Sequence, residues 1–348
     1  MTISAKTIEI SARGKWMMVP AWEINGKAII VKGSRLRVAE IEAEEWLETE
    51  LENPEECVKK LKEHRSEGPR ADILTFAQRV PEILQKYPYP LEWDSIAVVR
   101  VTKFDQWWEA LPQGTRKNVR RSQKRDVVVT VRELDDALIR GIVDVNNDSP
   151  LRQGRTFDHY GKSFDEVKKD QSTYPDRSGF ICAYSGEELI GFVKLVYSGN
   201  VASILQILPK ASHADKNPAN ALIAKAVEVC ESKGISYLIY GKYNYGNTGD
   251  NPLRQFKERN GFEEVLVPRY YVPLTFKGLC CMKLGLHHGI RGFLPTGVIR
   301  VLVNVRARWY KFLASRCSST LEQSNRIRQM ECSIPPAGSN TPPADDHS

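Results

Sequence analysis

The chain has few of the cysteine patterns that stabilise small or secreted proteins. Its 348 residues include seven cysteines, with no CxxC pair and no Cys/His set at zinc spacing. An odd count without these motifs argues against a disulfide framework and a structural metal, and it favours a reducing compartment. The chain also lacks an apolar run of about 18 residues, the length of a membrane span. The first residues, MTISAKTIEISARGK, lack the apolar core of a secretory signal. We therefore expect a cytoplasmic protein with no metal.

Most of the chain lacks an excess of either charge, because its positive and negative residues are nearly equal in number. Residues 1–276 carry 40 Lys and Arg against 39 Asp and Glu, whereas residues 277–330 carry ten Lys and Arg against Glu322 alone. The basic character therefore belongs to a C-terminal extension. With 41% apolar and 27% charged residues, the chain has the composition of a globular protein.

The N-terminal third shows short strand patterns followed by an acidic helical stretch. Residues 15–41 read as strands separated by the turn sequences NGK and KGS. Residues 42–64 read as helical, with Asn53 as the cap of a second helix and Pro54 in its first turn. The segments DILTFAQ and SIAVVRV then predict two further strands.

From residue 104 the pattern becomes more regular. Two short helices and a strand lead to an amphipathic helix that starts near Leu134, and another helix follows. The segments GFICAYS, ELIGFVKLVYS and VASILQIL predict an antiparallel meander, because Gly-containing turns join them. A helix, a strand, a helix and a last strand, EEVLVPRYYVPL, complete the unit.

This order of elements is similar to the fold of the GNAT acetyltransferase superfamily. The sequence FKERNGFEEV resembles the GNAT helix end and entry into the last strand, and Gly261 suits the helix C′ position. Two further segments, LPQGTRKNVRRSQKRDVVV and NPANALIAKAVEVCESKGISYLIYG, resemble the Fem-type aminoacyltransferases and related proteins of polysaccharide clusters. The resemblance covers roughly residues 100–275. It implies an α+β fold, with a GNAT-like mixed twisted sheet flanked by helices.

Four regions are expected along the chain. Residues 1–100 form an N-terminal α/β region, either an added unit or a degenerate partner GNAT half, and residues 101–276 form the GNAT-like acyltransferase domain. Residues 277–330 form a basic amphipathic extension, and the Ser/Pro-rich residues 331–348 are expected to be disordered.

The resemblance implies acyl transfer in a gap between two strands. In GNAT domains the fourth and fifth strands diverge and the acyl chain of the donor lies between them, here between SILQIL and YLIYG. A main-chain N–H near residues 205–207 would then stabilise the oxyanion. The loop PKASHADKNPAN has no glycine, whereas acetyl-CoA-using GNAT proteins carry a Gly-rich pattern there. The donor is therefore either acyl-CoA (acetyl-CoA) or aminoacyl-tRNA.

The loop before the long helix offers a seat for a phosphate. Asn217 at the cap and Pro218 at the first helical position form a helix N-terminus, with Lys210 and Lys216 nearby. The alternative is an ordinary helix start with solvated lysines. The candidate donor-binding residues are Lys210, Lys216, Asn217, Gln206 and Ile207.

Two histidines and two tyrosines are candidates for proton transfer. His213 and His159 titrate near neutrality and can act as bases. Tyr243 and Tyr245 follow the fifth strand, where GNAT enzymes often place a tyrosine that protonates the departing thiolate. The alternatives are structural histidines and packed aromatic rings.

The acceptor is expected to contact two segments. The loop SPLRQGRTFDHYGK is rich in planar donors that suit a carboxylate, phosphate or sugar, although it could also be a solvated loop. In the last strand, alternation sends Arg269 and Tyr271 to one face and Tyr270 to the other. The candidate acceptor-binding residues are Arg152, Gln153, Arg155, Tyr160, Arg269 and Tyr271.

Two basic helices suggest larger partners. Residues 115–125 carry six cations that suit tRNA phosphates or a nucleotide, unless they form a solvated face. Residues 297–313 predict a basic amphipathic helix, which suits an anionic membrane surface or packs on the domain. Docking of this helix would place the protein at the inner face of the membrane.

The sequence thus predicts an acyltransferase that acts by direct attack of an amine or hydroxyl on the donor. The acceptor would be a small molecule, glycan or peptide, and an envelope or polysaccharide precursor is the acceptor that membrane docking favours. The alternative is a non-catalytic GNAT-fold module that binds a nucleotide or a polyanion. The sequence leaves the oligomeric state open.

Overall fold

The computed structural model describes residues 3–12, 14–46, 50–152, 155–244 and 252–288. The chain separates into two compact units. The larger one comprises residues 1–150 and 157–296, and the smaller one residues 151–156 and 297–348. The described part of the smaller unit is a two-stranded hairpin, β8 (Leu151–Arg152) and β9 (Arg155–Thr156).

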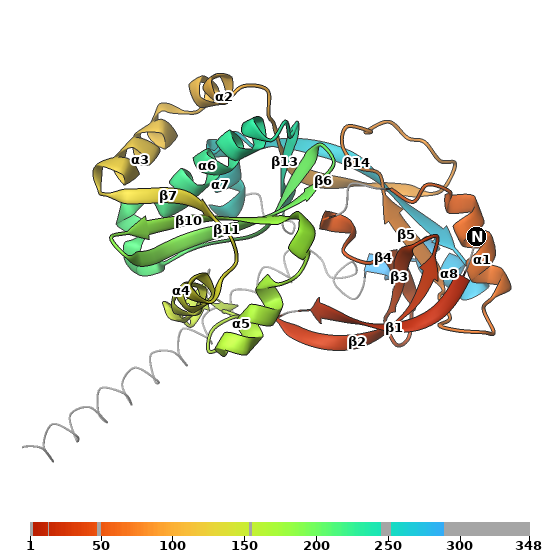
Figure 1. The fold of residues 1–348 in the computed structure, drawn as a ribbon. Coiled ribbons are helices and arrows are strands. Elements are labelled where there is room, and N and C mark those ends of the chain that lie inside the picture. Colours follow the sequence, from red (N-terminus) through yellow and green to blue (C-terminus); the bar gives the residue numbers. More distant parts are fainter. Residues whose placement is uncertain (1–2, 13, 47–49, 153–154, 245–251, 289–348) are drawn as a thin grey trace, which may run out of the picture. The chain divides into compact units, whose positions relative to one another are not determined.

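The larger unit is built on one mixed sheet of twelve strands, in the order β1-β2-β3-β4-β5-β14-β6-β13-β12-β11-β10-β7 (Figure 1). Most neighbouring strands are antiparallel, whereas β4–β5 and β12–β13 pair in parallel. The strands are β1 (Ile3–Ala12), β2 (Lys15–Ile24), β3 (Lys27–Lys32), β4 (Val38–Ile41), β5 (Ile73–Ala77), β6 (Leu91–Arg100), β7 (Val127–Arg132), β10 (Ser178–Ser185), β11 (Glu188–Ser198), β12 (Val201–Pro209), β13 (Tyr237–Lys242) and β14 (Glu263–Pro273).

Helices cover both faces of this sheet. The α-helices are α1 (Pro54–Glu63), α2 (Phe104–Ala110), α3 (Gln113–Lys124), α4 (Asp136–Asn147), α5 (Phe164–Gln171), α6 (Pro218–Ser232), α7 (Pro252–Arg259) and α8 (Phe276–Lys283). Short 3-10 helices are η1 (Glu44–Trp46), η2 (Pro175–Arg177), η3 (Ala211–Lys216) and η4 (Leu286–His288). The predicted α+β class, with a mixed twisted sheet flanked by helices, is confirmed.

Alternation along β10 and β11 separates two hydrophobic clusters. Ile181 and Val193 face a cluster with α6, which contributes Leu222 and Val227. The next residues along these strands, such as Cys182 and Phe192, face a second cluster beneath α4. Each fully buried aliphatic side chain contributes about 1.5–3 kcal/mol to folding. Figure 1 shows α6 on one face of these strands and α4 with α5 on the other.

The N-terminal strands agree with the sequence in part. The predicted strands between residues 15 and 41 and the antiparallel meander β10–β11–β12 are confirmed. Asn53 caps α1, because its side chain accepts a hydrogen bond of 3.1 Å from the Glu56 N–H. The acidic stretch holds only η1 and α1 as helices among its described residues, and β1 was not predicted.

One strand from the N-terminal region completes the sheet of the C-terminal region. β6 lies between β13 and β14 and pairs antiparallel with both. The sheet therefore runs across residue 100. The domain boundary expected there stays a prediction, as do the expected divisions at residues 276 and 330.

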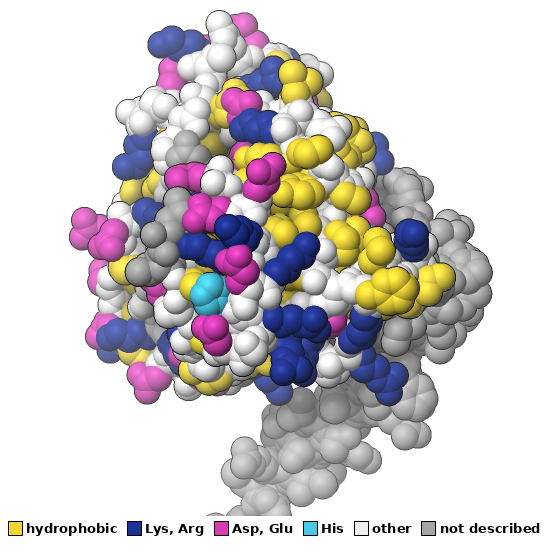
Figure 2. All heavy atoms as spheres, turned by 90° about the vertical axis from the view of Figure 1, so that its right-hand side faces the viewer, with side chains coloured by type: hydrophobic (Ala, Val, Ile, Leu, Met, Phe, Trp, Pro, Cys, Tyr) yellow, Lys and Arg dark blue, Asp and Glu magenta, His cyan; other side chains and the backbone are white. Residues whose placement is uncertain are grey.

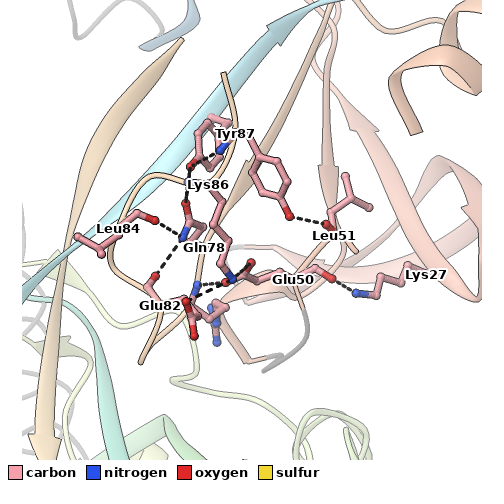
Figure 3. A network of polar contacts seen from close by, with 10 residues as sticks. Lys27, Glu50, Leu51, Gln78, Glu82, Leu84, Lys86 and Tyr87 are labelled. Atoms are coloured by element: carbon pink, nitrogen blue, oxygen red, sulfur yellow. Dashed lines mark hydrogen bonds and ion pairs between the residues drawn. The ribbon is translucent and has the colours of Figure 1, made fainter. Parts of the chain in front are cut away.

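A buried glutamine fixes the loop after β5 (Figure 3). Gln78 is 1% exposed, and its Nε2 donates to the carbonyls of Glu82 at 3.2 Å and Leu84 at 2.8 Å. Its Oε1 accepts from the Lys86 N–H at 3.1 Å and from the Tyr270 hydroxyl. Tyr270 is fully buried, so this face of β14 is core and the opposite face is free to line a site.

Candidate active site

β12 and β13 run side by side for only three residues. Val201–Ser203 pairs with Tyr237–Ile239, yet β12 continues to Pro209 and β13 to Lys242. β12 also bulges, because its register with β11 passes from Ile204 to Gln206 without a partner for Leu205. The divergence predicted between these strands is confirmed.

The gap opens onto a cavity of about 970 Å³. Leu205 and Gln206 of β12 and Lys242 of β13 line this cavity, so both diverging strands reach it. Residues of β1–β6, β14, the α5–η2 segment and η4 form the rest of its wall. A donor in the gap would therefore present its reactive end to this cavity.

An arginine between two carboxylates lies in the wall of this cavity. The guanidinium of Arg269 lies 2.8 Å from Glu44 and 2.5 Å from Asp94, and it donates to Thr75 Oγ1 at 3.4 Å. Burial disfavours its charge, but the two carboxylates outweigh burial and raise the pKa of Arg269 above its ordinary value. Burial also raises the pKa of Glu44, against the opposing effect of Arg269. Arg269 thus joins η1, β6 and β14 at the cavity.

Tyr271 lines the cavity beside a histidine. Its ring meets the ring of His287 edge-on, with centroids 4.8 Å apart, and His287 Nε2 lies 2.9 Å from Glu92. Burial raises the pKa of Tyr271 to about 12, so its hydroxyl stays protonated at neutral pH. The predicted common face of Arg269 and Tyr271, opposite to Tyr270, is confirmed.

Carboxylates outnumber cations around the cavity. Its acidic residues are Glu9, Glu40, Glu42, Glu44, Glu45, Asp94 and Asp170, and its lysines and arginines are Lys32, Lys242 and Arg269. Such a lining attracts an ammonium or hydroxyl group and repels an anion. The lining therefore suits a cationic or neutral polar group better than a carboxylate or a phosphate.

One carboxylate ties α5 to β2 and closes the wall on that side. Asp170 accepts from Trp16 Nε1 at 2.8 Å and from Lys162 Nζ at 2.5 Å, and it lies 3.5 Å from His159 Nδ1. Burial opposes ionisation, but these hydrogen bonds lower the pKa of Asp170 to about 2. His159, a predicted base, thus lines the cavity with its ring beside an ionised carboxylate.

The other predicted base lies outside the cavity lining. His213 Nε2 is 3.5 Å from Glu188, and Lys210 Nζ donates to the same carboxylate at 2.7 Å. Lys216 Nζ donates to Ser185 Oγ at 2.5 Å. Both lysines predicted to bind a donor phosphate therefore contact the β10–β11 turn region. Their donor-binding role stays a prediction.

The start of α6 differs from the expected cap. Pro218 occupies the first turn, but Asn217 has φ 52° and its side chain makes no capping hydrogen bond. Its Nδ2 donates instead to the Asp215 carbonyl at 3.0 Å. The Asp215 carboxylate pairs with Arg125 at 2.6 Å.

The Tyr243 side chain lies against α7. Its hydroxyl donates to Glu258 at 3.1 Å, its ring lies under Arg254, and its exposure is 6%. Burial raises the pKa of Tyr243, which keeps the hydroxyl protonated. Tyr245 lies outside the described residues.

The remaining predicted residues are scattered. Gln206 lines the cavity and accepts from Gln171 Nε2 at 2.9 Å, whereas Ile207 packs against the α6 cluster. Tyr160 is 48% exposed and does not line the cavity. Arg152 lies in β8 of the smaller unit, the Arg155 backbone lies in β9, and Gln153 lies outside the described residues.

Two groups of functional candidates had no sequence prediction. One is the acidic run Glu42–Glu45, which lines the cavity and which the sequence predicts as the start of an acidic helical stretch. The other is Lys257, which is fully buried and donates to the carbonyls of Tyr240 at 2.7 Å and Lys242 at 2.6 Å. Burial lowers the pKa of Lys257 to about 8. Lys257 stands in the polar helix PLRQFKER, so nothing in the local sequence indicated that its side chain is buried.

Two residues with left-handed backbone conformations lie in the cavity wall. Ala43 has φ 50° and Tyr174 has φ 57°, a region that side chains other than Gly, Asn and Asp rarely adopt. Each costs about 1–3 kcal/mol and persists only where the surroundings impose it, as they often do at functional sites.

An apolar surface lies on another side of the larger unit. α8 appears at the right of Figure 1, and Figure 2 views that side and shows apolar side chains gathered beside lysine and arginine. Exposed apolar residues of α8 and the turn after it are Phe276, Leu279, Leu284 and Leu286. Among the described residues, none of the helices has the length and apolarity to cross a membrane. The predicted amphipathic helix at 297–313 lies outside the described residues.

No family model and no curated protein matches this sequence. The structure is similar to that of FemX, with a TM-score of 0.43 and 10% identity over 76% of this chain and 88% of that one. It is also similar to the C-terminal domain of a putative lysylphosphatidylglycerol synthetase from Agrobacterium fabrum, with a TM-score of 0.49 and 14% identity over 75% and 85%. It is similar as well to a tandem GNAT protein from the clavulanic acid biosynthesis pathway. The TM-score is 0.40 and the identity is 8%, over 78% of this chain and 84% of that one. All three are similarities of fold, at 8–14% sequence identity.

Proposed function

We propose that this protein transfers an acyl or aminoacyl group from an activated donor to an amine or hydroxyl acceptor. The observation that carries the proposal is the divergence of β12 from β13 after Ser203 and Ile239, at the edge of a cavity of about 970 Å³. The donor's acyl arm would enter the gap and the acceptor would enter the cavity. The reacting carbon then lies where the two meet.

The diverging strands offer the backbone groups that such a reaction needs. Beyond the last paired residues, the facing edges of β12 and β13 are no longer joined to each other. An extended acyl arm can pair with such an edge like an added strand. Leu205 has no partner in the β11 register, and an N–H near residues 205–207 is the proposed oxyanion donor.

None of the five cysteines that the structure describes is placed to form a covalent enzyme intermediate, which supports direct attack. Burial raises the pKa of Cys57, Cys182 and Cys230 to about 12, so these thiols are not nucleophiles at neutral pH. Cys280 and Cys281 lie on α8, which does not line the cavity. The acceptor's own nitrogen or oxygen would therefore attack the donor.

The acidic cavity supports an acceptor that presents an amine or a hydroxyl, carried by a small molecule, a glycan or a peptide. The donor is acyl-CoA or aminoacyl-tRNA, and both present an acyl carbon on a long flexible arm. Peripheral attachment at the inner face of the membrane through residues 297–313 would favour an envelope or polysaccharide precursor as the acceptor.

Mass spectrometry of ligands that copurify with the full chain is the first test. A bound CoA, acyl-CoA or tRNA identifies the donor, and labelled acetyl-CoA or charged tRNA then reports transfer to amines and amino sugars. We expect label to move to an acceptor in a protein-dependent way. Failure of every donor to transfer, together with binding of polyanions, would reject the enzymatic proposal.

A non-catalytic module that binds a polyanion is the second candidate, because of α3. This helix buries Thr115, Val119 and Ser122 and leaves most of its cations at the surface. Arg125 is engaged with Asp215, and Arg120 lies 5.7 Å from the Trp108 ring. Binding of tRNA or polyphosphate that weakens steeply with salt, without any transfer, would favour this function.

A further inference from the structure

The acidic turn after β4 lies where β12 and β13 part. The Ser203 hydroxyl donates to the Glu45 carbonyl at 3.5 Å, and Ser203 is the last residue of β12 that pairs with β13. η1 also contacts both β11 and β12. The run from Glu42 to Glu45 thus lies beside the place where the reacting carbon of the donor is proposed to lie.

Most cavity carboxylates are already engaged. Glu9 pairs with Lys169, Glu40 with Lys32, Glu44 and Asp94 with Arg269, and Asp170 with Lys162. The side chain of Glu42 has no hydrogen bond or ion pair among the residues that the structure describes. Glu45 is exposed to solvent, whereas Glu42 is half-buried.

The backbone holds Glu42 toward the cavity. Val38 and Glu40 of β4 and Glu42 after it line the cavity, whereas Ala39 and Ile41 belong to the core cluster, with Ile41 also reaching the cavity. The Glu42 N–H donates to the Ala28 carbonyl at 2.8 Å, which anchors the residue to β3. The strained Ala43 follows directly, with φ 50°.

On its other side Glu42 faces the segment after α5. Burial first and the Glu42 carboxylate second raise the pKa of Tyr174 in this segment, and Gln171 at the end of α5 donates to Gln206 of β12 at 2.9 Å. Glu42 is therefore linked to the gap through neighbours on both sides, η1 and the 171–174 segment.

We propose that the Glu42 carboxylate is the general base that takes the proton from the acceptor, an inference that rests on the proposed acyl transfer. The lone pair of the acceptor nitrogen or oxygen forms the new bond to the acyl carbon. The C–S bond of a thioester, or the C–O bond of an aminoacyl ester, breaks, and its electron pair stays on the leaving sulfur or oxygen. One proton passes from the acceptor to Glu42, and Glu42 returns it to the leaving group.

The surroundings of Glu42 shift its pKa upward, the direction that a general base needs. Burial raises its pKa, while Lys6 of β1 and Lys32 of β3 oppose this effect. Both lysines are themselves paired, Lys6 with Glu23 at 2.7 Å and Lys32 with Glu40 at 2.5 Å. Tyr174 also faces Glu42, and it stays neutral because burial raises its pKa to about 12. The fall of kcat/KM at acid pH should therefore reflect protonation of Glu42.

The test compares wild-type protein with Glu42→Gln and Glu42→Asp in the transfer assay that detects the proposed activity, from pH 5 to 9. Glu42→Gln should lower kcat by about 10²-fold or more and remove the acid limb of kcat/KM, with an unchanged Kd for the donor. Glu42→Asp should keep the limb at a reduced rate. Glu228→Gln, on the exposed face of α6, is the matched control and should behave as wild type.

Unfolding measurements separate loss of a base from loss of the fold. A carboxyl whose pKa is raised in the folded state favours folding while protonated, and this contribution is lost as the pH rises through the raised pKa. Glu42→Gln mimics the protonated form, so its Tm should equal or exceed that of wild type at pH 7. If Glu42→Gln keeps the wild-type kcat and the acid limb of kcat/KM, the inference about Glu42 is overturned and the proposed acyl transfer is not. A wild-type protein that transfers nothing from any donor overturns the proposed function, and the base with it.

Discussion

At the scale of single residues, Arg269 holds the buried Glu44 and the half-buried Asp94 in place. Arg269→Met would leave Glu44, which is 9% exposed, without its arginine partner, and would leave Asp94 with Lys242 at 4.0 Å. Breaking a buried ion pair in this way costs about 3–5 kcal/mol, because the remaining charge has lost its partner. We expect that loss in the free energy of unfolding measured with urea at pH 7. The loss should shrink at pH 4, where the orphaned carboxylates can take up protons.

The comparison of Arg269→Met with Arg269→Lys tests geometry against charge. A lysine keeps the cation but cannot bridge two carboxylates with a planar fork. It should recover only part of the lost stability. Equal stability of Arg269→Met and wild type at pH 7 would contradict the view that Arg269 neutralises the pair.

Asp170 makes a second prediction at this scale. Its pKa is lowered to about 2, so its contribution to stability is fully present above the ordinary carboxyl value and is lost as the pH falls through about 2. Asp170→Asn should therefore lower Tm at pH 7 and leave it nearly unchanged near pH 2. The exposed Asp136, on α4, gives a matched Asp→Asn control. A pH-independent effect would mean that the carboxylate's charge does not matter.

At the scale of elements, α7 keeps the end of β13 away from β12. Lys257 on α7 donates to the carbonyls of Tyr240 and Lys242, in the stretch of β13 that no longer pairs with β12. Lys257→Met would remove both hydrogen bonds and leave these carbonyls without this donor, at about 1–3 kcal/mol each if they stay buried. We expect faster amide hydrogen exchange in β13 and weaker donor binding.

The control for this prediction is Lys225→Met, which removes an exposed lysine of α6 that pairs with Glu228. Hydrogen exchange by mass spectrometry should show no change in β13 for that variant. If Lys257→Met also leaves exchange of β13 unchanged, α7 does not maintain the divergence.

Elements with a local cause could be predicted from the sequence, whereas contacts between distant elements could not. The meander follows from alternation and turn residues, and Gly261 has the positive φ of 78° that its helix end requires. Alternation also placed Arg269 and Tyr271 together. The partners of Lys210 and Lys216 lie in and beside the β10–β11 turn, and Glu44 reaches Arg269 through a sheet that no local pattern specifies. The acidic turn was predicted as a helix, because the spacing of its charged residues fits a helix as well as a turn.

At the scale of the whole molecule, the two halves of the chain share one sheet. β6 (Leu91–Arg100) pairs with β13 through residues 237–242 and with β14 through residues 263–270. It carries Val98 and Val99, at 1% and 2% exposure, into the core. The cavity is likewise built from both halves, since Glu44 comes from the N-terminal region and Arg269 from the last strand.

Residues 101–348 expressed alone should therefore fail to fold. Removal of residues 1–100 takes β6 out of the sheet and exposes the edges of β13 and β14, which then invite aggregation. We expect an insoluble product, or a soluble one without a cooperative thermal transition, and we expect coexpression of residues 1–100 to restore a folded complex. The converse cut, which removes residues 289–348, leaves every strand of the larger unit and should keep cooperative unfolding. Cooperative folding of the 101–348 fragment would show that the C-terminal region is an independent domain. The gap between β12 and β13 would then belong to a fold that does not need the acidic turn of the cavity.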